Sequence, residues 1–245
     1  ARPLQRAGVR AFAVACLAEG IALRKAGIRG TILILGYTSP EEAPLLTRWH
    51  LTQTVADIDH GRALAARGRH VHLALDTGMH RLGILAENRK EILEAFRLPN
   101  LVVDGVFSHL YVSDSLETED VAYTQEQMTL FYDTVAWLRT AGYDPGKVHI
   151  QSSYGLWNLP AQPCDYVRAG IALYGVRSDD APVQRSLDRF CLSGPEWPVS
   201  ALYKPERAPG TGGSFRQSKK PIWRWSPSAT RTVCPGICLS GAARC

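Results

Sequence analysis

Three clusters of polar residues in this sequence have types and spacings that could carry chemistry. The first is the run D-T-G-M-H-R-L-G at 76–83, directly after an apolar stretch. Gly78 permits a tight turn there, and Arg81 offers a planar guanidinium fork that suits a carboxylate. The same run also fits a capped turn that carries a surface arginine. The cluster predicts carboxylate binding where other functional side chains join it.

The second cluster is G-V-F-S-H-L at 105–110, in which His109 closes an apolar run. A histidine in such a place is more often a structural residue than a catalyst. Its ordinary pKa nevertheless suits proton transfer near neutral pH. Alone, this cluster leaves both interpretations open.

The third cluster combines Q-S-S-Y-G at 151–155 with V-R-A-G-I-A-L-Y-G at 167–175. Hydroxyl groups and free backbone N–H groups at the ends of the last two strands make the usual phosphate cradle of a barrel. Ser152 and Ser153 could instead cap a helix, and Gly170 could serve a plain turn. Their position on consecutive segments favours phosphate binding.

The elements that would position these clusters follow from the apolar pattern between residues 10 and 175. Short apolar runs alternate with amphipathic stretches of about a dozen residues, which is typical of β/α units around a parallel sheet. Strands are predicted at 12–16, 31–35, 52–56, 70–75, 102–107, 148–151 and 166–168. Helices are predicted at 17–26, 41–48, 58–67, 86–96, 124–141 and 154–158.

The ends of these predicted helices carry recognisable boundary residues. Ser39 with Pro40 and Asp57 or Asp59 are suitable caps for helix starts. Glycines suited to helix ends follow three of the helices: Gly27, Gly68 and Gly142.

Two α/β architectures fit seven strands in this alternation. One is a (β/α)8 TIM-type barrel short of one unit, and the other is an open doubly wound sheet. No G-x-G-x-x-G run follows the first strand, which counts against a dinucleotide-binding fold.

Composition separates the chain into two parts. Its 245 residues are 45% hydrophobic, which suffices for a core of domain size. The net charge of +5 is uneven, because residues 189–245 hold nine Lys and Arg against two Glu. Four of the six cysteines lie in that tail, without the spacing of a disulfide framework. Cys234 and Cys238 lack a second ligand pair, so we expect no metal site.

The three clusters together carry a family resemblance. H-L-A-L-D-T-G-M-H-R-L-G-I at 72–84, F-S-H at 107–109 and V-R-A-G-I-A-L-Y-G at 167–175 resemble the alanine racemase family, in order and spacing, over about residues 1–188. S-H-L-Y-V-S-D-S at 108–115 and Q-S-S-Y-G at 151–155 are similar to the membrane-bound serine/alanine racemases of glycopeptide resistance. The resemblance implies a pyridoxal 5′-phosphate-binding barrel that interconverts L- and D-alanine, or L- and D-serine, for cell-wall peptidoglycan precursors.

The resemblance also implies roles for individual residues. Arg81 would bind the substrate carboxylate, and Arg168 would donate to the pyridine nitrogen of the cofactor. An arginine stays protonated and leaves that nitrogen unprotonated, which makes the ring a weaker electron sink and suits racemisation. Barrel decarboxylases of the same cofactor class use glutamate there. The phosphate would be held by Ser153, Gly170 and Ile171, while His109 would join the hydrogen-bond network behind the ring.

Departures from the family pattern are equally informative. The family often has lysine where this chain has Ala74, and asparagine where it has Ser152. The family's two catalytic bases are a lysine on the first barrel strand and a tyrosine in a second domain. Neither Lys25 nor Lys90 lies in a comparable context. We therefore expect the first strand and both bases to be missing, and this chain to have little or no racemase activity.

The basic tail, residues 189–245, has no strand or helix periodicity. Shifting permitted codons of residues 225–238 by one frame reads V-A-I-G-Y-A-D-G-L-P-R-D, which resembles the family's tyrosine motif. We interpret the tail as a frameshifted translation without an evolved structure. A non-enzymatic cofactor-binding barrel and a pseudogene product remain alternatives.

Partners and location follow from the same resemblance. It implies a small amino-acid substrate, a homodimer and a cytoplasmic domain, with a possible membrane domain upstream in the parent protein. No apolar run reaches the length of a membrane span. We expect no nucleic-acid partner, because the tail's charge would have no functional meaning.

Overall fold

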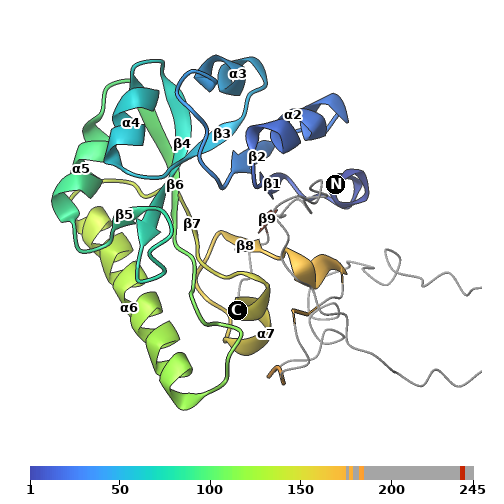
Figure 1. Ribbon diagram of the computed structural model, residues 1–245, viewed down its shortest axis with the longest axis vertical. Helices are drawn as coiled ribbons and strands as arrows, with labels where there is room; N and C mark the ends of the chain where they lie inside the picture. Colours follow the sequence, from blue (N-terminus) through green and yellow to red (C-terminus); the bar gives the residue numbers. More distant parts are fainter. Residues whose placement is uncertain (175–176, 179–181, 185–237, 241–245) are drawn as a thin grey trace, which may run out of the picture.

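The computed structural model describes residues 1–174, 177–178, 182–184 and 238–240. Strands and helices alternate along most of this length (Figure 1). The strands are β1 (Ala11–Val14), β2 (Thr31–Ile34), β3 (Thr52–Val55), β4 (Arg69–Asp76), β5 (Ile84–Leu85), β6 (Leu101–Phe107), β7 (Lys147–His149), β8 (Tyr166–Arg168) and β9 (Cys238–Ser240). The helices are α1 (Arg2–Arg6), α2 (Leu17–Lys25), α3 (Ala43–Arg48), α4 (Ile58–Ala65), α5 (Arg89–Arg97), α6 (Thr118–Thr140), α7 (Ser153–Asn158) and the 3₁₀ helix η1 (Ile171–Tyr174).

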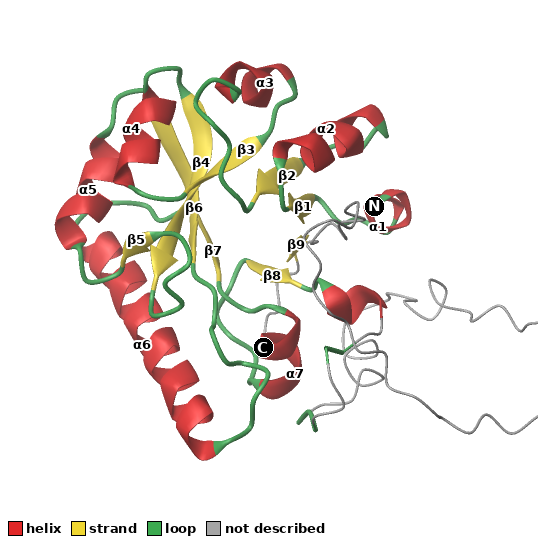
Figure 2. Cartoon of the chain, viewed as in Figure 1, coloured by secondary structure: helices red, strands yellow, loops and turns green. Residues whose placement is uncertain are grey.

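The central sheet is parallel and runs in the order β1-β2-β3-β4-β6-β7, with the short β5 beside the end of β4. β8 follows β7 through two backbone hydrogen bonds, from Asp165 N to Val148 O at 2.8 Å and from Arg168 N to Gln151 O at 2.9 Å. The sheet curls into a half-barrel whose long helices lie on its outer side (Figure 2). A doubly wound sheet is excluded, because the strand order never reverses.

The core has two parts on the two faces of the curled sheet. Between sheet and helices, Phe12 and Val14 of β1 pack in a large apolar cluster that includes Phe131 of α6. Inside the curl, Ala11 and Ala13 pack with Leu33. This alternation along β1 is the period of two expected for a strand, and both faces are covered as in other parallel sheets.

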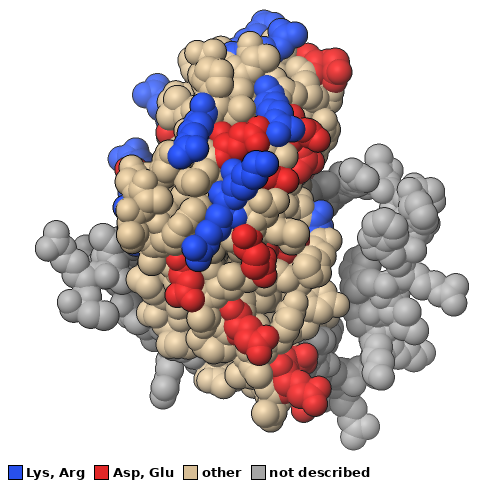
Figure 3. Space-filling model, turned by 90° about the vertical axis from the view of Figure 1, so that its left-hand side faces the viewer, with Lys and Arg blue, Asp and Glu red and all other residues tan. Residues whose placement is uncertain are grey.

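The outer surface over α4, α5 and α6 carries interspersed charges of both signs (Figure 3). Arg62 of α4 lies between Asp59 and Glu94, at 2.6 Å and 2.7 Å. Such exposed pairs contribute little to stability.

The predicted strands are confirmed to within two residues at each end. Asp57 caps α4 as expected, because its side chain accepts from His60 N at 2.7 Å. The three glycines predicted to end helices all have positive φ: Gly27 at 80°, Gly68 at 64° and Gly142 at 84°.

Three helix starts were wrong. α6 begins at Thr118 rather than 124, because acidic residues in its first turn favour the helix N-terminus where the apolar pattern is weak. α5 begins after Asn88, which accepts from Glu91 N at 3.3 Å, and not at 86. Ser39 Oγ accepts from Glu41 N in a turn, so α3 starts at Ala43 rather than at 41. The sequence patterns also missed α1, β5 and η1.

Most of the tail, residues 189–245, lies outside the described residues. The prediction that the tail has no evolved structure therefore stays a prediction. Its described part, Cys238–Ser240, forms β9, which pairs antiparallel with β8 in the register Arg168 to Cys238. β9 also lies beside β1, in the opening between the two ends of the curled sheet (Figure 1). The Cys234 and Cys238 side chains are not among those described.

No helix in the described ranges is both long enough and apolar enough to cross a membrane.

Candidate active site

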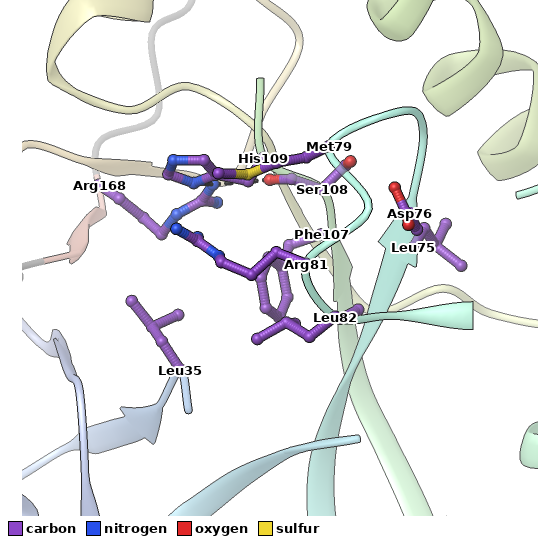
Figure 4. Close-up of a pocket in the computed structure, with 11 residues that line it drawn as sticks. Leu35, Leu75, Asp76, Met79, Arg81, Leu82, Phe107, Ser108, His109 and Arg168 are labelled. Carbon is purple, nitrogen blue, oxygen red and sulfur yellow. Dashed lines mark hydrogen bonds between the residues drawn. The ribbon is translucent and has the colours of Figure 1, made fainter. Parts of the chain in front are cut away.

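A cavity of about 70 Å³ lies at the carboxyl ends of the strands, inside the curl (Figure 4). The three clusters singled out from the sequence contribute to its wall, together with the end of β2. This is the edge at which barrel enzymes of the parallel β/α type bind their ligands. The lining residues are Leu35, Ala74, Leu75, Asp76, Met79, Arg81, Leu82, Phe107, Ser108, His109 and Arg168.

Arg168 closes β8 and is 5% exposed. Its Nη1 donates to His149 Nδ1 at 2.7 Å, and its Nη2 donates to Ser108 O at 2.6 Å and Ile150 O at 3.1 Å. The guanidinium carbon lies 5.2 Å from the ring centre of Phe107. These contacts come from the ends of two neighbouring strands, β6 and β7, and fix the orientation of the guanidinium in the cavity wall.

His109 also faces this guanidinium, with its Nδ1 3.3 Å from Arg168 Nη2. Burial, followed by the charges of Arg168 and then Arg81, lowers the pKa of His109 to about 3. The ring is therefore neutral at physiological pH. A neutral imidazole beside two arginines accepts hydrogen bonds and adds no positive charge to the cavity.

Two further histidines lie behind Arg168, and sequence reasoning missed both. His149 of β7 is fully buried, and its Nε2 lies 2.9 Å from Nδ1 of His72 of β4. Phe107 stacks on His149 with ring centres 4.9 Å apart. Burial and, to a smaller extent, the charge of Arg168 lower the pKa of His72 to about 4. The pKa of His149 is also lowered, first by burial and then by the charges of Arg168 and His72. A histidine within an otherwise apolar strand was the signal that could have found them.

The loop that presents Arg81 is held by Asp76, the last residue of β4. Asp76 Oδ1 accepts from the backbone N–H of Gly78 at 2.9 Å and from that of His80 at 3.0 Å, and Oδ2 lies 3.2 Å from His80 Nδ1. Tyr123 of α6 donates from its hydroxyl to Gly78 O at 2.8 Å. Gly78 and His80 have positive φ, 127° and 53°. The carboxylate is thus engaged within the loop, and the turn is tightly defined.

Arg81 itself lies across the cavity, with its guanidinium toward Arg168 and His109 (Figure 4). Within the described ranges it makes no hydrogen bond and no ion pair. Ala74, where the family often has lysine, presents only a methyl group to the same cavity. Two guanidinium groups therefore share one small space, which suits a ligand with negative charge.

The predicted phosphate residues lie together beside this cavity but do not line it. Ser153, the first residue of α7, is buried, and its Oγ accepts from Ala172 N at 3.1 Å. A Cβ on Gly170 would lie 3.7 Å from that oxygen, so the two segments are in close contact. Ser152 takes the N-cap position of α7 without a side-chain cap hydrogen bond.

One detail of the predicted cradle differs. The N–H of Gly170, which the sequence suggested as a phosphate donor, donates to Arg168 O at 2.9 Å and closes a tight turn. Ile171 begins η1, so its N–H group has no acceptor within that helix. The predicted phosphate cradle therefore consists of the Ser153 hydroxyl and the backbone N–H group at the start of η1.

The profile of the alanine racemase N-terminal domain matches residues 1–178. The chain belongs to the alanine racemase family. It is 46% identical over 171 residues to an amino-acid racemase of Enterococcus faecalis, which covers 69% of this chain and 24% of that protein. It is 44% identical over 178 residues to a serine/alanine racemase of Enterococcus gallinarum, covering 72% of this chain and 25% of the relative.

Among solved structures, the alanine racemase of Clostridium difficile 630 in complex with cycloserine matches with a TM-score of 0.68 and 30% identity. That match covers 76% of this chain and 52% of the other. The half-barrel thus has the fold of the barrel domain of the alanine racemase family. The chain spans about a quarter of the length of the enterococcal relatives and about half of the solved racemase.

Proposed function

We propose that this chain is the cofactor-binding part of a (β/α)8 racemase that interconverts the L and D forms of alanine or serine with pyridoxal 5′-phosphate, for cell-wall precursors. One observation carries the proposal. Arg168 and Arg81 line the same cavity at the strand ends, the first fixed by buried acceptors and the second without a partner in the described chain. The cavity therefore offers one guanidinium to a planar acceptor and another to a carboxylate.

The residues present fit the cofactor by the chemistry of their donors. Arg168 is a donor only and lines the cavity, so it would donate to the ring nitrogen of the cofactor. The Ser153 hydroxyl and the N-terminal end of η1 would hold the phosphate, with Gly170 allowing the close approach. His109, neutral and half-buried, would accept from donors behind the ring.

When bound, the cofactor supplies an electron sink that weakens the Cα–H bond of an amino acid. Arg168 keeps its proton and so limits that sink, which favours reprotonation at Cα over transamination. Arg81 would bind the substrate carboxylate and hold Cα in place, so that its proton can leave from one face and return on the other. The apolar lining from Leu35, Leu82 and Phe107 would exclude water from the reacting carbon.

The two catalytic bases, which would remove and return the Cα proton, are a separate part of the proposal. We infer that the lysine and tyrosine bases of the family are absent from this chain, and that the chain alone binds the cofactor but racemises little. Exchange of the alanine Cα proton with deuterated solvent, followed by NMR, tests this inference. Racemisation at the level of an intact family member would overturn it.

Cofactor binding tests the main proposal directly. Equilibrium dialysis of the full chain with pyridoxal 5′-phosphate should show saturable binding. Arg168→Lys should weaken it at least about tenfold, because lysine keeps the charge but loses the fork geometry. Ser153→Ala should weaken it by about the same factor.

Arg139→Lys, on the exposed end of α6, is the matched control and should leave binding unchanged. Binding that ignores both site variants would reject the cofactor site. Binding with no racemase activity even in the longer parent protein would favour a non-enzymatic cofactor carrier instead. A decarboxylase is disfavoured by arginine at position 168.

We also propose that the intact parent is a homodimer that takes a small amino acid as substrate and whose racemase domain is cytoplasmic. The enterococcal relatives are about four times longer than the matched segment, which leaves room for further domains, a membrane domain among them. Sedimentation of the parent's racemase portion should give a dimer mass. A monomer with full activity would contradict this assembly.

A further inference from the structure

Three side chains from three strands form a continuous hydrogen-bonded line that ends at the cavity. Arg168 of β8 contacts His149 of β7 at 2.7 Å, and His149 contacts His72 of β4 at 2.9 Å. These side chains are 5%, 0% and 2% exposed, respectively. Hydrogen bonds this deeply buried are costly to leave unmade.

This line of hydrogen bonds depends on a glycine in β6, the strand that lies between β4 and β7. Gly105 of β6 faces His72, and a Cβ there would lie 2.6 Å from His72 Cε1 and 2.7 Å from its Nδ1. The β4–β6 register also shifts at Val71/His72, which re-aims the side chains beyond it. The histidine thus reaches across a glycine to a strand that β4 does not pair with.

The direction of each hydrogen bond follows from what each group can do. An arginine has only donors, so His149 Nδ1 must accept from Arg168. A neutral imidazole that accepts at Nδ1 carries its proton on Nε2, so His149 donates to His72 Nδ1. His72 accepts at Nδ1 and carries its own proton on Nε2. Burial keeps both rings neutral, as the lowered pKa values of His72 and His149 indicate.

We propose that His72 is a positioning residue for Arg168: by accepting a hydrogen bond from His149 Nε2–H, it fixes the tautomer of His149 whose Nδ1 lone pair faces the guanidinium. In the other tautomer, the His149 Nδ1 proton would point at the Arg168 Nη1 donor. Two donors at 2.7 Å repel, and the guanidinium would leave its place in the cavity wall. The effect of this positioning on cofactor binding and catalysis rests on the proposed function, whereas the assignment of the two histidine tautomers does not depend on it.

A matched pair of substitutions separates the acceptor from the bulk of the ring. His72→Asn keeps an oxygen near the position of Nδ1, while His72→Leu fills similar space without an acceptor. His70→Leu, two residues earlier on β4 with a largely exposed side chain, is the control. The full chain, which has seven histidines, is labelled with ¹⁵N-histidine and ¹⁵N-arginine, and single substitutions assign the signals of His72, His149 and Arg168.

The expected spectrum of the unsubstituted chain shows Nδ1 unprotonated and Nε2 protonated for both His149 and His72. His72→Leu should mix or reverse the His149 tautomer and shift the guanidinium signals of Arg168. His72→Asn should restore both, and His70→Leu should leave them unchanged. Pyridoxal 5′-phosphate affinity should fall at least about tenfold in His72→Leu and recover in His72→Asn.

A protonated Nδ1 at either ring of the unsubstituted chain would overturn the proposal, even if His72→Leu failed to fold. So would a His72→Leu variant whose His149 and Arg168 signals match those of the unsubstituted chain. If the tautomers are as expected but the cofactor never binds, the proposed function fails and the positioning role of His72 stands.

Discussion

The two ends of the half-barrel both hold a pair of arginines, and they use them differently. At the amino ends of the strands, a cavity of about 390 Å³ is lined by Arg24 and Arg69. Arg24 donates to the backbone carbonyls of Trp49, Ile28 and Gly30 at 2.9–3.0 Å. Arg69 likewise donates to backbone carbonyl oxygens. At the carboxyl ends, Arg168 is held by side chains and carbonyls, and Arg81 is held by nothing described.

The contrast shows that cavity size alone does not locate a binding site. In the larger cavity most guanidinium donors bond to backbone carbonyl oxygens, although Arg69 Nε has no acceptor within the described residues, so these arginines fasten neighbouring segments to one another. The smaller cavity contains Arg81. Its loop is held by Asp76, and its guanidinium donors have no acceptor within the described residues. The amino-end arginines thus serve the stability of the fold, whereas the carboxyl-end arginines lie where other β/α barrels bind their ligands.

The largest effect that could break this comparison is expected for Arg24→Ala. Several backbone carbonyls would lose their donor, and the free energy of unfolding should fall by about 2–4 kcal/mol. Urea unfolding of the chain measures the loss. Cofactor affinity of the variant under folding conditions should stay within about twofold, since the cavity is at the other end. A loss of affinity without a loss of stability would mean that the amino-end arginines serve binding.

A pH series should reveal the neutral histidines of the carboxyl end. The pKa values of His72 and His109 are lowered by burial to about 4 and about 3, below the ordinary value of 6.5. The unfolded chain therefore binds more protons in acid. Their stabilisation is complete above about pH 6.5 and is lost as the pH falls through the folded values. One pKa unit corresponds to about 1.4 kcal/mol.

Urea midpoints between pH 7 and pH 5 measure this loss while most carboxylates stay ionised. His72→Asn removes one of the titrating groups and should make the midpoint less sensitive to pH. An unchanged pH dependence in that variant would show that the amino end or the surface, and not the buried histidines, governs acid stability.

The smallest stability effect is expected for Arg81→Ala, which sharpens the comparison from the other side. The side chain is exposed and unpaired in the described chain, so the free energy of unfolding should change by less than about 0.5 kcal/mol. Binding of propionate to the cofactor-loaded chain, followed by calorimetry, should weaken about tenfold. Equal affinity in both proteins would remove Arg81 from the carboxylate site.

Polar groups that directly follow apolar runs stand out in the sequence, and Arg81 and His109 were singled out in this way, whereas Arg168 was singled out through the family resemblance. All three line one cavity, and their roles stay predictions. His72 and His149 were missed, because they lie within strands where an apolar pattern hides them. What joins them depends on the β4–β6 register and on Gly105, which no local pattern encodes.

The helices show the same division between local and distant causes. Asp57 was identified as a cap because its partner, His60, is three residues away. The occupied N–H of Gly170 could not be foreseen, since its turn conformation depends on how β8 meets η1. Interactions between residues close in the sequence can therefore be predicted from it, whereas contacts between strands cannot be predicted without the fold.

β9 has a consequence for how the molecule would open. Its pairing with β8 joins residues about seventy positions apart, from Arg168 to Cys238, through a strand of three residues. A ladder of three residue pairs has few backbone hydrogen bonds to hold it closed. Amide protons of this ladder should therefore exchange with solvent through a local opening, far sooner than those of β4 and β6, whose exchange awaits global unfolding.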